Sequence, residues 1–93
     1  MPYFRRPWEE SRGDQYDSWG HSIWYFETDL AYNVSRQIEV YDHGPTLRYG
    51  PDHQLDDFGQ LSDQPLDADD FSVFEIQSDE FERAWESAGS QPG

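Results

Sequence analysis

The chain of 93 residues contains no cysteine, which excludes disulfide scaffolds, thiolate zinc sites, iron–sulfur clusters and cysteine nucleophiles. It also contains no lysine, so six arginines stand against 20 aspartates and glutamates, and the formal net charge is -14. Binding to nucleic acid or to an anionic membrane needs clustered positive charge. The charge balance therefore argues against direct contact with either.

Long apolar runs are also missing. No segment approaches the roughly 20 apolar residues of a membrane-spanning helix, and residues 1–8 lack the apolar stretch of a signal peptide. We therefore expect a cytoplasmic protein. What the chain does have is aromatic residues: four tryptophans, six tyrosines and six phenylalanines. Each ring can bury about 150–250 Å², so we expect a folded domain with a core built mainly from rings, despite a charge typical of disorder.

Composition divides the chain into three parts. Residues 1–18 form an arm that holds half of the arginines, and its prolines exclude a regular helix around its aromatic residues. We expect this arm to lie over the domain through its rings or to be flexible. Residues 19–89 are predicted to form a single acidic domain, followed by a frayed tail at 90–93.

Four segments of the domain are rich in β-forming residues and are predicted strands: 22–28, 34–42, 46–49 and 71–76. In the second, apolar positions alternate with mostly polar ones, which is typical of a half-buried strand. Arg36 is an exception, because it occupies one of the apolar positions. The turn residues Asp42–Pro45 predict a hairpin between the second and third strands. Between the third and fourth, residues 50–70 are predicted to form a long loop that leucines pin to the core.

The last element is predicted to be an amphipathic helix over residues 79–88, with Gly89 ending it. Phe81, Ala84, Trp85 and Ala88 fall on one apolar stripe. We expect Trp85 to be buried against the sheet together with Phe81. The fold class that follows is α+β: a small antiparallel sheet of about four strands with one C-terminal amphipathic helix packed on it.

Several motifs together resemble a family of small bacterial domains of unknown function. They match in order and spacing over residues 24–88: Tyr-Phe-Glu-Thr-Asp at 25–29, Arg-Gln-Ile-Glu-Val-Tyr-Asp-His-Gly at 36–44, Gly-Gln-Leu at 59–61 with Pro65-Leu66, and the Glu-Phe-Glu-x-x-Trp-like motif within 75–85. The arm and the middle loop depart from the family. The resemblance implies the order strand, hairpin, loop, strand, helix and a bacterial or phage origin. It implies no activity.

Catalytic patterns are weak. General acid–base chemistry needs carboxyls in different environments, and Glu27, Asp29 and Glu39, near the sheet, are the best candidates. No serine nucleophile motif or glycine-rich phosphate loop occurs. His43 and His53, each preceded by an aspartate, are weak candidates for metal ligands, although they are expected at opposite ends of a hairpin. We expect no enzyme, no cofactor and no metal site.

Charged residues inside the predicted sheet need partners. Arg36 is expected to form a buried ion pair with Glu27 or Glu75, with Asp29 also in reach. Adjacent carboxylates such as Asp56 and Asp57, and likewise Asp69 and Asp70, are expected to have pKa values raised by mutual repulsion.

The excess of acid has three explanations: solubility or salt adaptation, attraction to a basic protein, and imitation of a nucleic-acid backbone. The leading hypothesis is a non-catalytic interaction domain, an inhibitor, immunity-type or anti-defence protein that binds a basic, nucleic-acid-handling partner. The alternative is a small-ligand or metal-binding domain. The predicted partner-binding residues are Asp52, Asp56, Asp57, Asp63, Asp67, Asp69, Asp70, Asp79, Glu80, Glu82 and Glu86.

Overall fold

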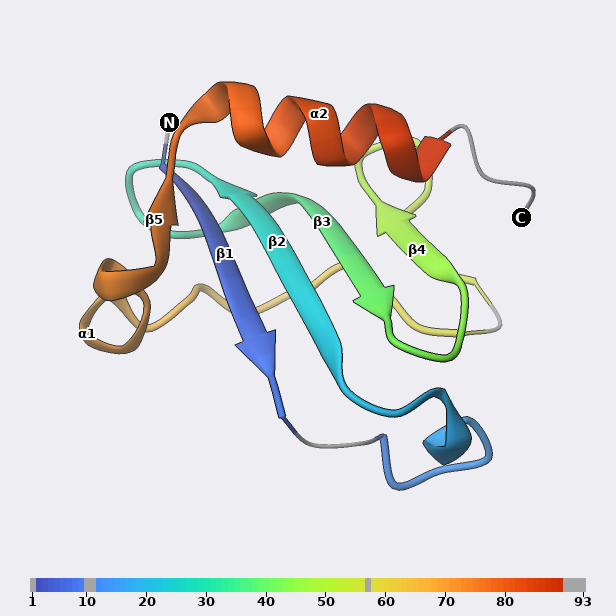
Figure 1. Ribbon diagram of the computed structural model, residues 1–93. Helices are drawn as coiled ribbons and strands as arrows, with labels where there is room; N and C mark the ends of the chain where they lie inside the picture. Colours follow the sequence, from blue (N-terminus) through green and yellow to red (C-terminus); the bar gives the residue numbers. More distant parts are fainter. Residues whose placement is uncertain (1, 10–11, 57, 90–93) are drawn as a thin grey trace.

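The computed structural model describes residues 2–9, 12–56 and 58–89. These form a five-stranded antiparallel sheet with a helix across one face (Figure 1). The strand order is β4-β3-β2-β1-β5, and the strands are β1 (Tyr3–Trp8), β2 (Ser22–Thr28), β3 (Val34–Tyr41), β4 (Thr46–Tyr49) and β5 (Glu75–Ile76). The helices are α1 (Ala68–Phe71) and α2 (Ser78–Gly89), with short 3-10 turns η1 (Asp17–Trp19) and η2 (Ser72–Phe74). The α+β class with a C-terminal helix is confirmed, but the strand count of four was too low.

The additional strand lies in the expected arm. β1 pairs with β2 along its whole length and with β5 at Tyr3 and Phe4. Beyond Phe4, one edge of β1 has no strand beside it among the described residues, and an open edge is where a strand tolerates a proline such as Pro7. The prolines and arginines of this segment led to the prediction of an arm. Composition alone could not predict that Phe4 packs in the core with 1% of its surface exposed.

The expected strand at 71–76 is mostly helical. Only Glu75 and Ile76 pair as β5, whereas Phe71 ends α1 and residues 72–74 form η2. The cause is local: the Asp67 side chain accepts a hydrogen bond from the backbone N–H of Asp69 and caps α1. The aspartates that indicated a loop therefore begin a helix.

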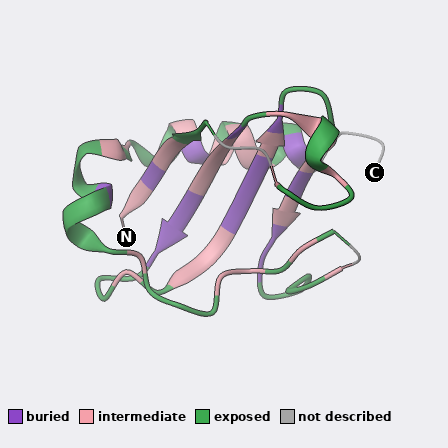
Figure 2. Cartoon of the chain, turned by 90° about the horizontal axis from the view of Figure 1, so that it is seen from below, coloured by how far each residue is buried: buried purple, intermediate pink, exposed green. Residues whose placement is uncertain are grey.

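The two faces of the sheet are covered differently. On the helix face, where Tyr25, Ile38 and Val40 point, α2 packs with Phe81 fully buried. On the loop face, where Trp24, Phe26, Gln37, Glu39 and Tyr41 point, the segment 58–67 crosses the strands (Figure 2).

A β-bulge changes the phase of β3. Glu27 pairs with Arg36 but Thr28 pairs with Val34, which leaves Ser35 as the extra residue. As a result Val34 packs on the loop face against Phe4, Phe26 and Phe71, whereas Arg36 points to the helix face. The expected single phase from Val34 to Val40 is thus broken at the bulge.

The helix α2 runs as expected, with one difference at its apolar stripe. Phe81 is fully buried, but Trp85 is half-buried and lies parallel to Phe81 at a ring distance of 6.2 Å. The guanidinium carbon of Arg48 lies over the Trp85 ring, 4.5 Å from its centroid. The expected burial of Trp85 against the sheet is therefore only partial: the ring packs against the core that contains Phe81, and Arg36 and Arg48 also stack on it. None of the helices in the described ranges has the length and apolar character that a membrane crossing requires.

Candidate functional site

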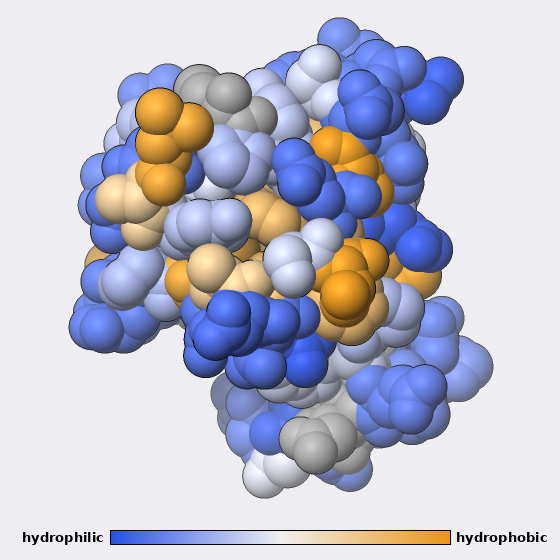
Figure 3. Space-filling model, turned by 90° about the vertical axis from the view of Figure 1, so that its left-hand side faces the viewer, coloured by the Kyte–Doolittle hydropathy of each residue, from blue (hydrophilic) through white to orange (hydrophobic). Residues whose placement is uncertain are grey.

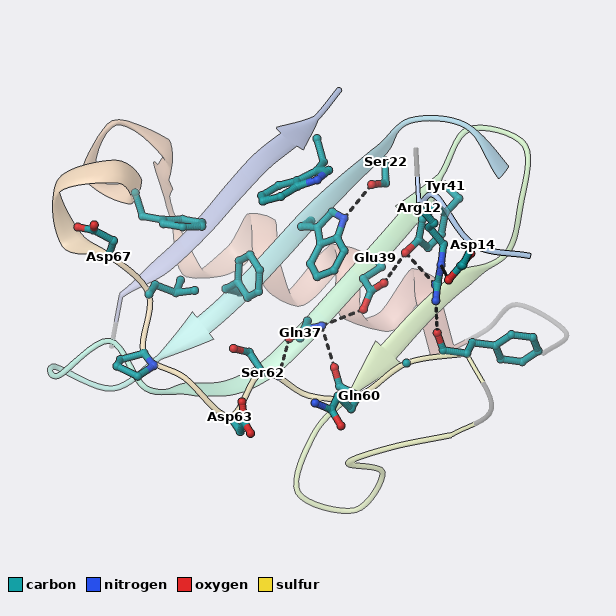
Figure 4. Close-up of a pocket in the computed structure, with 18 residues that line it drawn as sticks. Arg12, Asp14, Ser22, Gln37, Glu39, Tyr41, Gln60, Ser62, Asp63 and Asp67 are labelled. Atoms are coloured by element: carbon teal, nitrogen blue, oxygen red, sulfur yellow. Dashed lines mark hydrogen bonds and ion pairs between the residues drawn. The ribbon is translucent and has the colours of Figure 1, made fainter. Parts of the chain in front are cut away.

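An open groove of about 720 Å³ lies on the loop face (Figure 4). Strands β1, β2 and β3 supply its floor and one wall, and the segment 58–67 with Phe71 supplies the other. We call this feature the groove. Its lining residues are Trp8, Arg12, Asp14, Ser22, Trp24, Phe26, Gln37, Glu39, Tyr41, Phe58, Gly59, Gln60, Ser62, Asp63, Pro65, Leu66, Asp67 and Phe71.

Polar side chains of β3 form the floor of the groove. Gln37, Glu39 and Tyr41 have exposed fractions of 1%, 3% and 6%. The Tyr41 hydroxyl donates to Glu39 Oε1 at 2.5 Å, and Gln37 Nε2 donates to Glu39 Oε2 at 2.8 Å. Both carboxylate oxygens of Glu39 therefore accept a hydrogen bond from a neighbour on the same strand.

Contacts from the covering segments fix the direction of these hydrogen bonds. The backbone N–H of Ser62 donates to Gln37 Oε1 at 2.9 Å, so the amide nitrogen of Gln37 must face Glu39 and the carbonyl of Gln60. At the other end, Arg12 Nη1 donates to the Tyr41 oxygen at 3.3 Å, so the Tyr41 proton points to Glu39. Gln37, Glu39 and Tyr41 thus form a buried row in which each hydrogen-bond donor faces an acceptor.

Burial raises the pKa of Glu39, and the hydrogen bonds from Tyr41 and Gln37 oppose the rise. The same burial, together with the hydrogen bond to Glu39, raises the pKa of Tyr41. Glu39 was one of three carboxyls named from the sequence as candidates for acid–base chemistry. The other two differ: the hydrogen bonds from Arg36 hold the pKa of Glu27 low, and those from Asn33 hold the pKa of Asp29 low.

Arg12 closes one end of the groove. Its guanidinium donates to the carbonyl of Phe58 at 2.6 Å and to Asp14 at 3.2 Å, and its carbon lies 5.8 Å from the Tyr41 ring centroid. It also lies over the rings of Tyr16 and Trp19. A residue of the expected arm thus joins the loop to the floor of the site.

Aromatic rings form the opposite wall. The indole N–H of Trp24 donates to Ser22 Oγ at 2.7 Å, which fixes the orientation of that ring. Trp24 packs against Trp8 at 5.8 Å and against Phe26 at 5.9 Å between ring centroids. The groove therefore combines a rigid aromatic wall with a rim that carries the exposed carboxylates of Asp63 and Asp67.

The acidic residues predicted to bind a partner do not make one surface. Asp63 and Asp67 line the groove on the loop face, whereas four of the others lie on α2, across the sheet. Those four are Asp79, Glu80, Glu82 and Glu86. Asp57 lies outside the described residues, as does the tail predicted at 90–93.

Several of these carboxylates have partners within the chain. Asp56 Oδ1 accepts from the Tyr49 hydroxyl and from two backbone N–H groups, and its Oδ2 lies 2.9 Å from His53 Nε2. Burial raises the pKa of Asp56, but these hydrogen bonds outweigh it and the pKa is lowered. The expected rise from repulsion with Asp57 was therefore wrong for Asp56. Asp79 lies 3.8 Å from Arg83, and Glu80 lies 4.0 Å from Arg5.

Other carboxylates have no such partner. In the described ranges, the side chains of five predicted partner-binding residues make no hydrogen bond or ion pair: Asp52, Asp63, Asp69, Asp70 and Glu86. All five are exposed.

Arg36 lies on the helix face between two carboxylates. Its guanidinium makes two hydrogen bonds to Glu27, of 2.9 and 2.5 Å, and two to Glu82 of α2. Glu75, the other carboxylate expected near Arg36, is exposed on β5 and makes no ion pair with it. Glu82 was predicted to face a partner and instead joins α2 to the sheet.

The structure separates the two candidate metal ligands. His43 precedes β4 and His53 follows it, where His53 stacks on Tyr49 and pairs with Asp56. Within the residues described, no group of three or more histidines, aspartates or glutamates could hold a metal ion.

Sequence reasoning missed most of the groove. Gln37, Tyr41, Arg12 and Trp24 were not proposed for a site. One signal could have found it: neighbouring antiparallel strands share a face, so the rings of Trp24 and Phe26 must be covered together with the polar phase of β3. No protein-family model, curated protein or solved structure matches this chain. The resemblance described above therefore stays a prediction.

Proposed function

We propose that this protein is a non-catalytic domain that binds a basic protein partner. The observation that carries the proposal is the different placement of the two kinds of charge. Five of the six arginines lie over aromatic rings of their own chain: Arg5, Arg6, Arg12, Arg36 and Arg48. The exposed carboxylates include five without an internal partner, as described above. The charge presented to a partner is therefore mostly negative.

A surface of this kind favours positively charged partners in two ways. It steers them toward the domain over distances of about a Debye length, roughly 10 Å at 0.1 M salt. It also penalises acidic partners through repulsion. Proteins that handle nucleic acids carry clustered arginine and lysine for phosphate contacts. An inhibitor, immunity-type or anti-defence protein of the cytoplasm, whose carboxylates take the place of phosphates, is the role that we propose.

The experiment that tests this proposal measures binding to peptides graded in charge. Arginine-rich, lysine-rich and glutamate-rich peptides of equal length are titrated into the protein by calorimetry at low and high salt. We expect both basic peptides to bind, with affinity that falls steeply as salt rises, and the acidic peptide not to bind. Absence of binding by both basic peptides would sink the proposal.

A second experiment tests the class of partner. A DNA-binding protein or nuclease that co-purifies with the domain is first bound to labelled duplex DNA. The domain is then added in excess, and the complex is followed in a gel-shift assay. We expect the DNA to be released. Simultaneous binding of DNA and the domain would show that the carboxylates do not occupy the phosphate-binding surface.

A further inference from the structure

We propose that the groove binds an arginine side chain of the partner, with the guanidinium over the Trp24 ring and paired with Asp63 and Asp67. The inference rests on the proposed function, because it takes the partner to be basic. It commits the groove to one class of occupant.

The chain itself places arginines on rings that line this groove. At one end, Arg12 lies over Tyr41 and donates to the Phe58 carbonyl. Near the other end, Arg6 lies 5.1 Å from the Trp8 ring centroid and 4.9 Å from that of Phe71. Both Trp8 and Phe71 line the groove. The stretch that includes Trp24, Leu66 and the two rim aspartates has the same ingredients, rings beside carboxylates. Arg6 pairs with Trp24 across β1 and β2, but its guanidinium lies over Trp8 and Phe71, and among the described residues no arginine lies over the Trp24 ring.

The charge of the groove complements a cation. Its lining contains Asp14, Asp63 and Asp67 beside Glu39, against the single arginine Arg12. The Asp14 carboxylate is paired with Arg12, whereas the Asp63 side chain has no internal partner. Glu39 is too buried and too fully hydrogen-bonded to contact a ligand directly. Its ionised form adds a negative field below the rings.

Arginine fits this geometry better than lysine. A guanidinium is flat, weakly hydrated and able to stack on an indole while it donates in plane to carboxylates. An ammonium is a strongly hydrated point charge and loses more solvation on a ring surface. Trp24 is held by its hydrogen bond to Ser22 and by packing on Trp8, so the platform is rigid before binding. On the side of the molecule that carries β5 and α1, the apolar patches lie among hydrophilic residues (Figure 3).

The test uses three short capped peptides that differ at one position, which is arginine, lysine or citrulline. Each is titrated into the labelled protein, and amide and indole N–H signals are followed by NMR. We expect the indole signals of Trp8 and Trp24 and the backbone signal of Ser62 to shift with the arginine peptide. Trp85, on the helix face, is the internal reference and should not shift. The lysine peptide should bind more weakly, and the neutral citrulline peptide most weakly.

Matched variants locate the charge that matters. Asp63→Asn with Asp67→Asn removes two rim carboxylates and should weaken the arginine peptide about tenfold, because two charge-assisted hydrogen bonds are lost. Asp69→Asn with Asp70→Asn removes the same charge from α1, outside the groove, and should change the affinity less than about threefold.

The outcomes separate this inference from the proposed function. Basic peptides that bind but shift signals away from Trp8 and Trp24 would overturn the groove assignment and leave the acidic interaction domain standing. A citrulline peptide that binds as tightly as the arginine peptide would also overturn it and favour a groove for uncharged small ligands. No binding by any arginine-containing peptide would overturn the groove assignment, and no binding by the lysine-containing peptides as well would overturn both.

Discussion

Gln37 and Glu39, which are two residues apart on β3, are both buried, and the amide of Gln37 donates to the carboxylate of Glu39 at 2.8 Å. Their roles cannot be exchanged, because the Ser62 backbone N–H occupies the Gln37 carbonyl oxygen. The pair therefore depends on one amide and one carboxylate in this order, although the two side chains have nearly the same shape.

The first prediction exploits this isosteric relationship. Gln37→Glu replaces the amide donor by an oxygen and sets two carboxylates 2.8 Å apart in a buried site. Two like charges at this distance cannot both ionise without a large penalty. We expect a loss of about 3 kcal/mol in the free energy of unfolding at pH 7, with partial recovery at pH 5 as the pair takes up a proton.

Urea unfolding at the two pH values measures the effect of Gln37→Glu. Gln60→Glu is the control, because the side chain of Gln60 is exposed and only its backbone carbonyl enters the network. Equal stability losses in the two variants would contradict the role assigned to the Gln37 amide.

The second prediction concerns the pH dependence of the native protein. The pKa of Glu39 is raised in the folded state, so its contribution to stability is fully present below its unfolded pKa of about 4.3 and is lost as pH rises through the folded pKa. Glu27 and Asp56 have lowered pKa values. Their contributions are present above the unfolded pKa and are lost as pH falls through the folded pKa. The unfolding free energy should therefore be highest in the mildly acidic range.

Unfolding free energies from pH 3 to 8, at a salt concentration of about 0.3 M to screen surface repulsion, give this profile. In Glu39→Gln the decline on the alkaline side should disappear, whereas the acid decline should persist. Glu86→Gln, at an exposed position of α2, is the control and should show both the acid and the alkaline decline in the unfolding free energy. A Glu39→Gln variant with an unchanged alkaline decline would assign that decline to other groups.

The third prediction concerns the two partners of Arg36. The side chain of Glu27 is 10% exposed and that of Glu82 is 45% exposed. Removal of the cation in Arg36→Met leaves Glu27 charged and unpaired in a buried site, which should cost about 3–5 kcal/mol. Glu82→Gln should cost less than about 1 kcal/mol, because water solvates the exposed end of the pair.

A double-mutant cycle between Glu27→Gln and Arg36→Met measures the coupling in chemical denaturation. We expect the double variant to be more stable than Arg36→Met alone, since the buried negative charge is then gone. A double variant less stable than either single one would mean that Arg36 stabilises the fold mainly by packing over Phe81 and Trp85.

The fourth prediction compares the two large side chains of α2. Phe81 is fully buried between the sheet and the helix, and Phe81→Ala should cost about 3–5 kcal/mol. Trp85 is half-buried, so Trp85→Ala should cost less, although it also removes the ring on which Arg36 and Arg48 stack. Thermal melting of the two variants ranks them. The opposite ranking would show that the arginine stacking outweighs burial in the core.

Parts of this fold follow from periodicity alone. The alternation in β2 and β3 and the apolar stripe of α2 depend on neighbouring residues, so the sequence predicts them well. β1 escaped prediction because its assignment depends on distant partners, with Phe4 opposite both Phe26 and Glu75. The bulge at Ser35 likewise depends on the pairing of two strands.

The candidate site was harder to predict than the fold. Polar residues at alternate positions of a strand, such as Gln37 and Glu39, normally indicate a face that is exposed to solvent. Its burial requires a covering segment whose path is set by contacts far away in sequence, such as that of Arg12 with the Phe58 carbonyl. Only Glu39, among the buried row, was named from the sequence as a candidate for chemistry.

The pairing of β1 with β5 joins the beginning of the chain to its last quarter, with Tyr3 opposite Ile76. During synthesis, β1 leaves the ribosome before the other strands described here, yet one of its two neighbours, β5, emerges only after the groove-covering segment 58–67 has been made. Contacts between such distant positions slow folding, because the entropy of closing a long loop is lost before the contacts form. A nascent chain stalled before residue 75 therefore lacks the strand that covers the edge of β1 at Tyr3 and Phe4 in the complete fold, so this edge is open along the whole strand.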